Sequence, residues 1–447
     1  MKMKTGFKTV LALSLCFIMA AAFMSCGGKT TIESLAIKPL NINIAKNTII
    51  QFQATGSQSN GTIGNVTSQV TWSSSNSAVA TISSSGLLTA VGAGTVTITA
   101  SAPGNITAQS TLTVTVPTSA TFPVGVNPSS IAIDSTGDVW VTNEGDNTVT
   151  ELLYTAPPVG PSWATNPSGP FPVGANPSSI AIDGADNVWV TNKGANTITE
   201  LNSSGALIGT YTVGANPSRI AIDYLGYVWA TIQGGGNGAP LGNTVIKLTL
   251  VSGQPSISTF TVGTGPNSIA IDAAGDVWVT NKGSDAVPGS TVTELNSLGA
   301  LIGTYTVGSE PDSIAIDPYG NVWVTNQGSD AAPGSTVTEL GSNGAFLGTV
   351  NGVGSEPHAI AVDSAGSVWV SNYGSTAVPG TTIMELSPTN GAILNTFPVY
   401  NNPSSIAIDG INNVWVANYG SDSVTVWKGA ATGPQFRLYL AGPFWPY

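Results

Sequence analysis

The side chains best suited to chemistry lie at the starts of three similar segments in the second half of the chain. In these segments the residue after a proline is Asn267, Asp312 or His358, where most other copies of the segment have Ser. Glu310 and Glu356 precede the proline in the second and third segments. His358 is the sole histidine. A carboxylate beside an imidazole can orient a general base, and several carboxylates can hold a cation.

Three roles remain open for this group. His358 could act as a general base oriented by Asp312. It could instead be one ligand of a weakly bound divalent cation, together with Glu310 and Glu356. A single His is more often an incidental polar residue at the start of a strand, so we predict no cofactor and no dedicated metal site. We favour a protein that is not an enzyme.

These segments belong to a phrase that occurs seven times, first as P-S-S-I-A-I-D-S-T-G-D-V-W-V-T-N from Pro128 to Asn143. The spacing between copies lies in the forties, and each copy combines short Val/Ile/Thr-rich runs with Gly-containing turns. Such a period is typical of a propeller blade. The sequence therefore predicts an all-β fold, with a seven-bladed β-propeller over residues 120–447. The Asp of each phrase is Asp134, Asp183, Asp223, Asp272, Asp317, Asp363 and Asp409.

The repeated Asp and Trp residues have a structural interpretation. The Asp precedes a tight D-x-x-G turn, where its carboxylate can accept hydrogen bonds from the turn backbone. The Trp lies in a strand that neighbouring blades bury, which predicts packing. The alternatives are a catalytic or metal-binding Asp and an aromatic platform for sugars. The Trp residues are Trp140, Trp189, Trp229, Trp278, Trp323, Trp369 and Trp415.

Two segments compete to close the ring. Ala120–Val124 precedes the first blade and resembles the outer strand that precedes later blades. Phe436–Leu440, near the C-terminus, is also strand-like. Closure by either segment would remove an open sheet edge. The choice between them stays open.

The connections between the second and third strands differ among blades. Blades four to six carry about five extra residues there, and blade three has a longer Gly-rich connection over 234–242. Insertions in repeat proteins map to one face, often the binding face. We therefore predict a ligand-binding face that includes Asp285 and Asp330 of these loops, together with Asn267, Glu310 and Glu356 beside the channel mouth.

The N-terminus has the features of an export signal. Lys2, Lys4 and Lys8 precede an apolar run over residues 9–24, and Phe23-Met24-Ser25-Cys26 resembles the bacterial lipobox. The resemblance implies a lipoprotein signal peptide over residues 1–25 and lipidation of Cys26, which would attach the chain to a membrane. The alternative is an ordinary signal peptide. Gly27 lacks the acidic character that favours inner-membrane retention, so we expect display on the cell surface or outer membrane.

Residues 33–116 alternate polar and apolar residues in short runs, as half-buried strands do. The segment contains a strand with Trp72, followed by S-x-N-x-x-V-A-T-I, G-L-L-T-A and G-T-V-T-I-T-A. It resembles the group 2 bacterial immunoglobulin-like domain. The resemblance implies a small β-sandwich that serves as a spacer or adhesion module, with Trp72 in its core.

Composition excludes several functions. The chain has 12 basic and 24 acidic residues, a formal net charge of −12, which argues against nucleic acid as a partner. Arg219 and Arg437 are the only arginines, too few for a multi-arginine clamp. Of Cys16 and Cys26, the first lies in the predicted signal peptide, so no disulfide is expected.

The repeated phrase resembles NHL-type propeller repeats and the blades of the virginiamycin B lyase family. In that family a histidine in a P-H-G-I segment is catalytic, and Pro357-His358-Ala359-Ile360 is the matching segment here. The resemblance implies a catalytic role for His358 alone, because a second channel histidine is missing. We favour a binding scaffold whose ligand is a protein or a glycan. The alternatives are a lyase or hydrolase centred on His358 and a passive surface protein.

Overall fold

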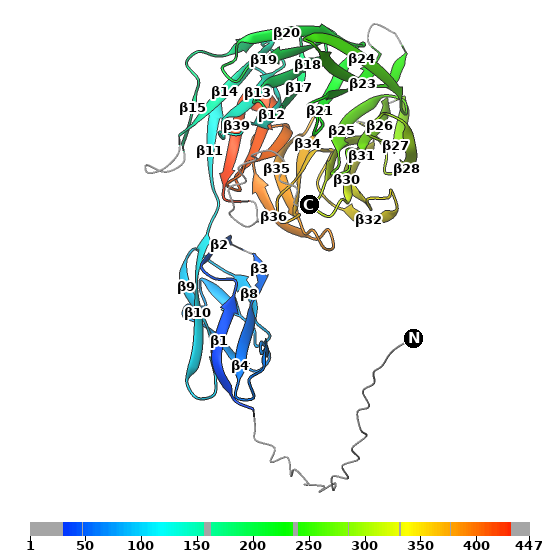
Figure 1. Cartoon of the computed structure of the whole chain (residues 1–447). Helices are drawn as coiled ribbons and strands as arrows, with labels where there is room; N and C mark the ends of the chain where they lie inside the picture. The colour runs from blue at the N-terminus through cyan, green and yellow to red at the C-terminus, as the bar shows by residue number, and fades with distance from the viewer. Residues whose placement is uncertain are drawn as a thin grey trace, which may run out of the picture.

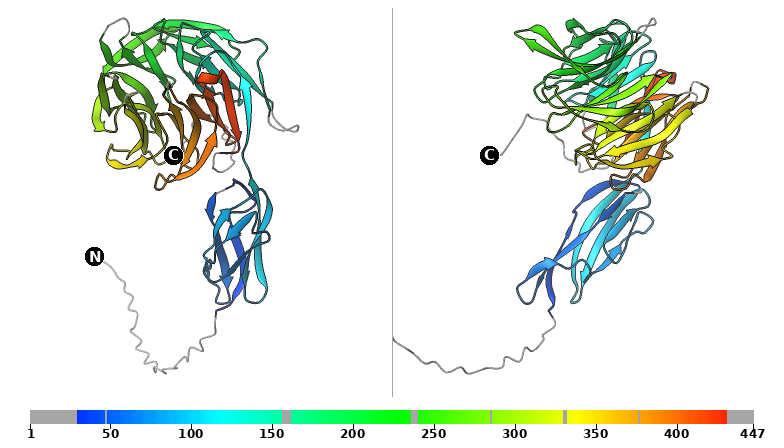
Figure 2. Two further views of the ribbon diagram at one scale, coloured as in Figure 1. Left: turned by 180° about the vertical axis from the view of Figure 1, so that it is seen from behind. Right: turned by 90° about the vertical axis from the view of Figure 1, so that its right-hand side faces the viewer.

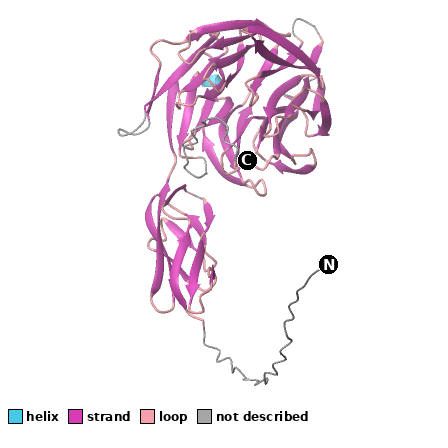
Figure 3. Ribbon diagram, in the orientation of Figure 1, coloured by secondary structure: helices cyan, strands magenta, loops and turns pink. Residues whose placement is uncertain are grey.

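The computed structural model describes residues 30–46, 48–155, 162–235, 240–284, 286–329, 332–375 and 377–430. A slender β-domain is followed by a ring of β-sheets (Figure 1). Strands form nearly all regular structure in the described ranges, apart from a short 3₁₀ turn, η1, Tyr419–Ser421 (Figure 3). No helix in these ranges is long and apolar enough to cross a membrane. The predicted all-β fold is confirmed.

The first domain is a β-sandwich that begins at Ile32. Its core contains Phe52 and Trp72, whose rings meet edge to face at 6.0 Å, as predicted for Trp72. Alternation in β9 and β10 buries one residue in two on the sandwich interior. The strands are β1 Ile32–Lys38, β2 Ile42–Ala45, β3 Ile49–Gln51, β4 Gln53–Gln58, β5 Ile63–Asn65, β6 Thr71–Ser74, β7 Ala80–Ile82, β8 Leu87–Ala90, β9 Gly94–Ala102 and β10 Ile106–Thr115.

The ring consists, within the described ranges, of seven sheets of four or five strands. Each blade runs antiparallel from an inner strand at the channel to an outer strand at the rim (Figure 2). Blades 1 to 3 are β12 Pro128–Ile133, β13 Val139–Asn143, β14 Thr148–Thr155, β15 Ser162–Thr165 and β16 Phe171–Pro172; β17 Pro177–Ile182, β18 Val188–Asn192, β19 Thr197–Leu201 and β20 Leu207–Thr212; β21 Pro217–Ile222, β22 Val228–Gly234, β23 Leu241–Val251 and β24 Gln254–Thr261.

The remaining blades follow the same plan, and the last one takes a strand from the other end of the domain. Blades 4 to 7 are β25 Pro266–Ile271, β26 Val277–Ser284, β27 Val287–Leu295 and β28 Leu301–Thr306; β29 Pro311–Ile316, β30 Val322–Ser329, β31 Ala332–Leu340 and β32 Phe346–Asn351; β33 Pro357–Val362, β34 Val368–Gly374, β35 Pro379–Leu386 and β36 Ile393–Pro398; β37 Pro403–Ile408, β38 Val414–Asn418 and β39 Ser423–Lys428 with β11 Thr118–Pro123.

The N-terminal strand closes the ring. β11 pairs antiparallel with β39, with Ala120 opposite Val426 and Phe122 opposite Val424. The Phe122 ring stacks on Trp415 at 6.0 Å. Inner strands contact one another around the channel, and β12 of blade 1 contacts β37 of blade 7. The rival segment Phe436–Leu440 lies outside the described residues.

The repeated Asp and Trp residues form one structural unit in every blade. One carboxylate oxygen, Oδ2, accepts a hydrogen bond from the Trp Nε1 at 3.0–3.3 Å. The other oxygen, Oδ1, accepts backbone N–H groups of the turn, as Ile411 and Asn413 donate to Asp409. All seven Trp side chains are buried. The turn and packing interpretations are therefore confirmed.

A glutamate lies opposite the Trp in five blades, on the third strand. Glu151 and Glu385 are buried, and burial raises the pKa of each carboxyl to about 7, although Asn166 and Asn395 donate hydrogen bonds to them. These groups therefore take up a proton on folding at mildly acidic pH.

We expect the propeller to lose stability as pH rises from 5 to 8. Between the unfolded and folded pKa values the folded chain holds a proton that the unfolded chain lacks, so stability falls with increasing pH. Glu385→Gln keeps an acceptor for Asn395 and should stabilise the protein at pH 8 by about 2 kcal/mol, with little effect at pH 5. Urea denaturation at both pH values measures this. Glu33→Gln, at an exposed position of β1, is the control, and equal effects of the two variants would contradict the prediction.

Candidate functional site

A circular chain of polar side-chain contacts lines one end of the channel. It is built by the residue after the proline of each inner strand, a set that we call the inner ring: Ser129, Ser178, Ser218, Asn267, Asp312, His358 and Ser404. Five of the blade boundaries are crossed by a hydrogen bond from one of these side chains, at 2.7–3.0 Å, and a sixth is crossed by the 2.8 Å ion-pair contact of His358 with Asp312. Six of the seven blade boundaries carry such a link. Among the described contacts, the boundary between His358 and Ser404 has none.

Asp312 contacts two other members of the inner ring, Asn267 and His358, and also Lys282. Its Oδ2 lies 2.8 Å from His358 Nδ1, and its Oδ1 lies 2.5 Å from Lys282 Nζ. Asn267 Nδ2 donates to Oδ1 at 3.0 Å and to the Asp312 carbonyl at 2.9 Å. The predicted trio of Asn267, Asp312 and His358 is therefore brought together, and Lys282 joins it.

The electrostatic environment keeps Asp312 ionised. Burial by itself would raise the pKa of this carboxyl, but His358, Lys282 and Arg219 outweigh burial and hold the pKa well below its usual range. Asp312 can therefore orient His358 without itself taking a proton.

His358 presents its second nitrogen to the channel. His358 Nδ1 is in ion-pair contact with Asp312, and Arg219 Nη2 lies 3.5 Å from His358 Nε2. Whenever the imidazole is neutral with its proton on Nδ1, the lone pair lies on Nε2. Arg219 belongs to blade 3 and His358 to blade 6, so this contact crosses the channel. The Arg219 Nη1 donates to the Ser178 carbonyl at 2.8 Å. The arrangement has the geometry of a base with its orienting carboxylate, beside a guanidinium.

A second set of side chains surrounds the inner ring. Each directly follows the five-residue V-W-V-T-N phrase, or its variant, of the second strand, and we call the set the outer ring. Its backbone N–H donates in every blade to the carbonyl before the inner-strand proline, at 2.9–3.1 Å, and each residue is half-buried. The outer ring is Glu144, Lys193, Gln233, Lys282, Gln327, Tyr373 and Tyr419.

The outer ring carries charges that sequence reasoning missed. Burial raises the pKa of Glu144, and the cations Lys193 and Arg219 partly offset this. Burial lowers the pKa of Lys193, with Glu144 opposing the shift and Arg219 and Lys282 adding to it. These four groups and Asp312 thus share one electrostatic network. The signal for them is the amino-acid variation that follows the V-W-V-T-N phrase, which differs from blade to blade while the phrase itself does not.

Aromatic rings complete one side of the mouth. Tyr373 lies 5.0 Å from His358 between ring centroids, and Tyr419 lies 6.3 Å from Tyr373. Burial, with nearby Tyr419 and carboxylates including Glu144 and Glu356, raises the pKa of Tyr373 to about 12. Its hydroxyl therefore stays protonated at physiological pH.

Glu310 and Glu356 lie at a position where the backbone adopts a positive φ, in the left-handed region. The residue before the inner-strand proline has a φ of 48° to 60° in all seven blades, and the other blades place Asn or Gly there. Both glutamates are buried in the turns beneath the outer ring, and their carbonyls accept the Gln327 and Tyr373 N–H groups. They lie next to the site, as predicted, with at least one structural task.

The longer connections of blades 3 to 6 also have a structural task. In blades 4 and 5 they extend the second and third strands into hairpins, with Gly283 opposite Pro288 and Gly328 opposite Pro333. A glycine carbonyl of each hairpin accepts the N–H of the next blade's turn, as Gly289 does for Glu310 at 2.8 Å. The short connections use a side chain instead, such as Asn147 Oδ1. The predicted binding residues Asp285 and Asp330 lie outside the described residues, as does the lipidation site Cys26.

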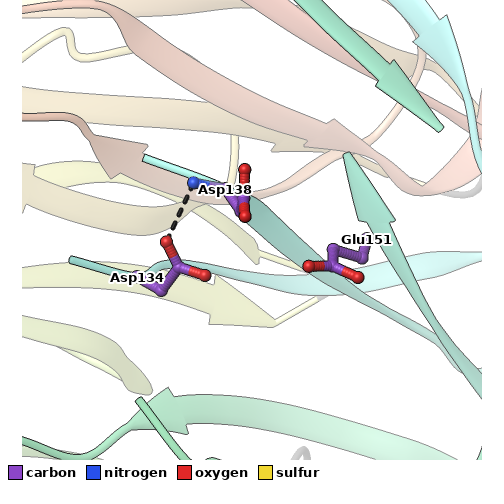
Figure 4. A group of neighbouring side chains, drawn as sticks. All are labelled: Asp134, Asp138 and Glu151. Atoms are coloured by element: carbon purple, nitrogen blue, oxygen red, sulfur yellow. Dashed lines mark hydrogen bonds between the residues drawn. The ribbon is translucent and has the colours of Figure 1, made fainter. Parts of the chain in front are cut away.

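Two carboxylate triads lie at the turn end of the blades, away from the inner ring. Figure 4 shows the first, Asp134, Asp138 and Glu151. Asp134 accepts from Trp140 Nε1 and from the Asp138 N–H, and Asp138 accepts from the Tyr154 N–H. Since their oxygens serve the turn and the Trp, this group is a structural anchor. The second triad is Asp272, Asp276 and Glu294.

Comparison with known proteins identifies the first domain and the fold of the second. The family described as bacterial Ig-like domain (group 2) matches residues 31–116. Ice-binding protein 1 of Shewanella frigidimarina is 51% identical over 61 residues, which are 14% of this chain and 7% of that protein. The chain thus spans a small part of this relative. Both matches are consistent with an extracellular or surface protein.

The propeller is similar to solved structures at low sequence identity. Virginiamycin B lyase from Staphylococcus aureus is 18% identical, with a TM-score of 0.55 over 70% of this chain and 99% of that one. A catalytically inactive variant of that lyase with quinupristin gives 18% and 0.54, over 70% and 99%. The WD40 propeller domain of Doa1 gives 12% and 0.55, over 69% and 95%. At these identities the likeness shows the fold alone.

We expect Asp312→Asn to destabilise the propeller because Lys282 and the other cations then lose their buried counter-charge. Breaking such a pair costs about 3 kcal/mol. The Asp312 contribution is complete above the pKa of an unfolded aspartate and is lost as pH falls toward the lower folded pKa. The cost of the substitution should therefore shrink by about 1 kcal/mol between pH 6 and pH 3. Urea denaturation measures it, and a cost independent of pH would contradict the prediction.

Proposed function

We propose that this chain is an exported, lipid-anchored binding module that presents the propeller channel mouth to a glycan or protein ligand. The observation that carries the proposal is the composition of the mouth. The described part of the propeller has five Lys or Arg residues, and Lys193, Arg219 and Lys282 all belong to the network around His358. An acidic chain that gathers its few cations at one place supports a site rather than a solvated surface.

The architecture supports presentation of that site. A bacterial Ig-like domain and a propeller in succession suggest an interaction scaffold. Lipidation at Cys26 would hold the N-terminus at a membrane, and the Ig-like domain would separate the propeller from it. The outer membrane or cell surface is the location that the Gly27 position favours.

We expect ligand binding at the channel mouth to depend on His358 and Tyr373, which lie side by side there. We expect the chain from residue 27 onward to bind a component of a glycan and protein array, and His358→Ala and Tyr373→Ala to weaken that binding at least fivefold. Tyr319→Ala is the control, because Tyr319 is exposed on a turn at the opposite end of the blade. A blank array, or equal binding by all three variants, would refute the proposed function.

The second candidate function is acid–base catalysis at the same site. The 2.8 Å contact between His358 Nδ1 and Asp312 Oδ2 favours it, since an oriented imidazole with a lone pair at the channel can abstract a proton. Linearisation of quinupristin, assayed by mass spectrometry, tests a lyase activity like that of the structural relative. Turnover by the wild type that His358→Ala abolishes, with ligand binding retained, would favour the enzyme over the scaffold.

Anchoring has its own test. We expect Cys26→Ala to abolish incorporation of labelled palmitate and to release the protein from the membrane fraction. Stable membrane attachment needs more than one acyl chain, and the variant would carry no acyl chain at this position. Cys16→Ala should behave as the wild type. Membrane retention of the Cys26→Ala protein would show that the segment is not a lipoprotein signal.

A further inference from the structure

Lys193 and Arg219 form no close ion pair with a carboxylate of the described residues, although Glu144 acts on both electrostatically. The ion pairs of the described residues join Lys247 to Asp223 and Asp312 to Lys282 and His358, and none includes Lys193 or Arg219. Both side chains are half-buried. A cation withdrawn from water without an ion-pair partner raises the free energy of the folded state. A bound anion would remove that cost.

Carboxylates of the protein are already committed elsewhere. Asp312 receives donors from Lys282, His358 and Asn267. No Glu144 oxygen lies within 4.0 Å of the Lys193 or Arg219 nitrogens, so neither cation has a direct ion-pair partner there. Arg219 uses Nη1 on the Ser178 carbonyl, while Nη2 has only the 3.5 Å contact with His358. Its guanidinium can therefore offer a donor to a ligand, and guanidinium geometry suits carboxylates.

The aromatic side of the mouth defines the rest of the ligand. Tyr373 and Tyr419 are adjacent, half-buried rings beside His358. Aromatic faces next to polar side chains suit a ligand with apolar C–H faces and polar edges. Gln233 and Gln327 add uncharged donors and acceptors to the outer ring. A carbohydrate ring has both features, and an extended acidic peptide lacks the flat C–H face.

We propose that the channel mouth binds an acidic carbohydrate. Lys193 and Arg219 take the carboxylate of a uronate residue, and its ring, or the ring of its neighbour, packs on Tyr373 and Tyr419. This inference rests on the proposed function and names its ligand class. It adds Lys193, Arg219 and Tyr419 to the residues that determine specificity.

Calorimetry with defined oligosaccharides tests the inference. The probes are an oligogalacturonate trisaccharide, its fully methyl-esterified form and a glutamate hexapeptide. We expect the wild type to bind the free acid at least tenfold more tightly than the other two probes, with affinity that falls as salt increases. Lys193→Gln should weaken binding of the acid about tenfold and leave the ester unchanged. Lys38→Gln, at an exposed position of the Ig-like domain, is the matched control.

The variants separate the two parts of the site. Tyr419→Ala should weaken both the acid and the ester, because stacking does not depend on charge. Thermal unfolding confirms that each variant is folded. Equal affinity for acid and ester, or a preference for the hexapeptide, would overturn the inference. An array ligand that needs His358 but is a neutral glycan would also overturn it while leaving the proposed function intact, whereas a blank array would refute the proposed function itself.

Discussion

Closure of the ring is the constraint on which the rest of this structure depends. Seven inner strands must lie side by side around one channel, and each brings polar backbone and side-chain groups into a narrow space. Unsatisfied groups there would be costly. Side chains of the inner ring form hydrogen bonds across five of the blade boundaries. At the rim, β11 pairs with β39 and so satisfies the backbone groups of that strand. The chain thereby avoids open edges where its two ends come together.

The candidate site arises where that circular chain departs from its pattern. Serines pass the hydrogen bond onward at blades 1, 2, 3 and 7, and Asn267 does so at blade 4. His358 instead points back to Asp312 and exposes Nε2 to Arg219. Among the described contacts, the His358 side chain therefore makes no hydrogen bond to the next blade, and its Nε2 is available to a ligand. The missing link is at the boundary between blades 6 and 7, whereas the boundary between blades 5 and 6 has a second bond, from the Thr325 hydroxyl to the His358 carbonyl.

Much of the fold could be predicted because it repeats. A Trp, an Asp six residues before it and a turn between them define a local unit, and the structure confirms both roles in all seven blades. The longer connections were harder to interpret. Their length suggested a binding face, but the carbonyl of Gly289 does for Glu310 what the side chain of Asn147 does for Asn176. Two different local sequences satisfy one backbone N–H, and only the contact reveals the equivalence.

Periodicity and residue type alone predict the seven repeats, the Trp and Asp positions and the departure at Asn267, Asp312 and His358, because each depends on short-range pattern. They also place the Ig-like domain. Only the folded ring shows that β11 pairs with β39, and only there do Lys193, Arg219 and Lys282 of blades 2, 3 and 4 come to the same mouth. Residues tens of positions apart meet there because the ring returns each blade to the channel. The variable residue after each V-W-V-T-N phrase marks the positions, but local sequence does not show which of these residues share one electrostatic network.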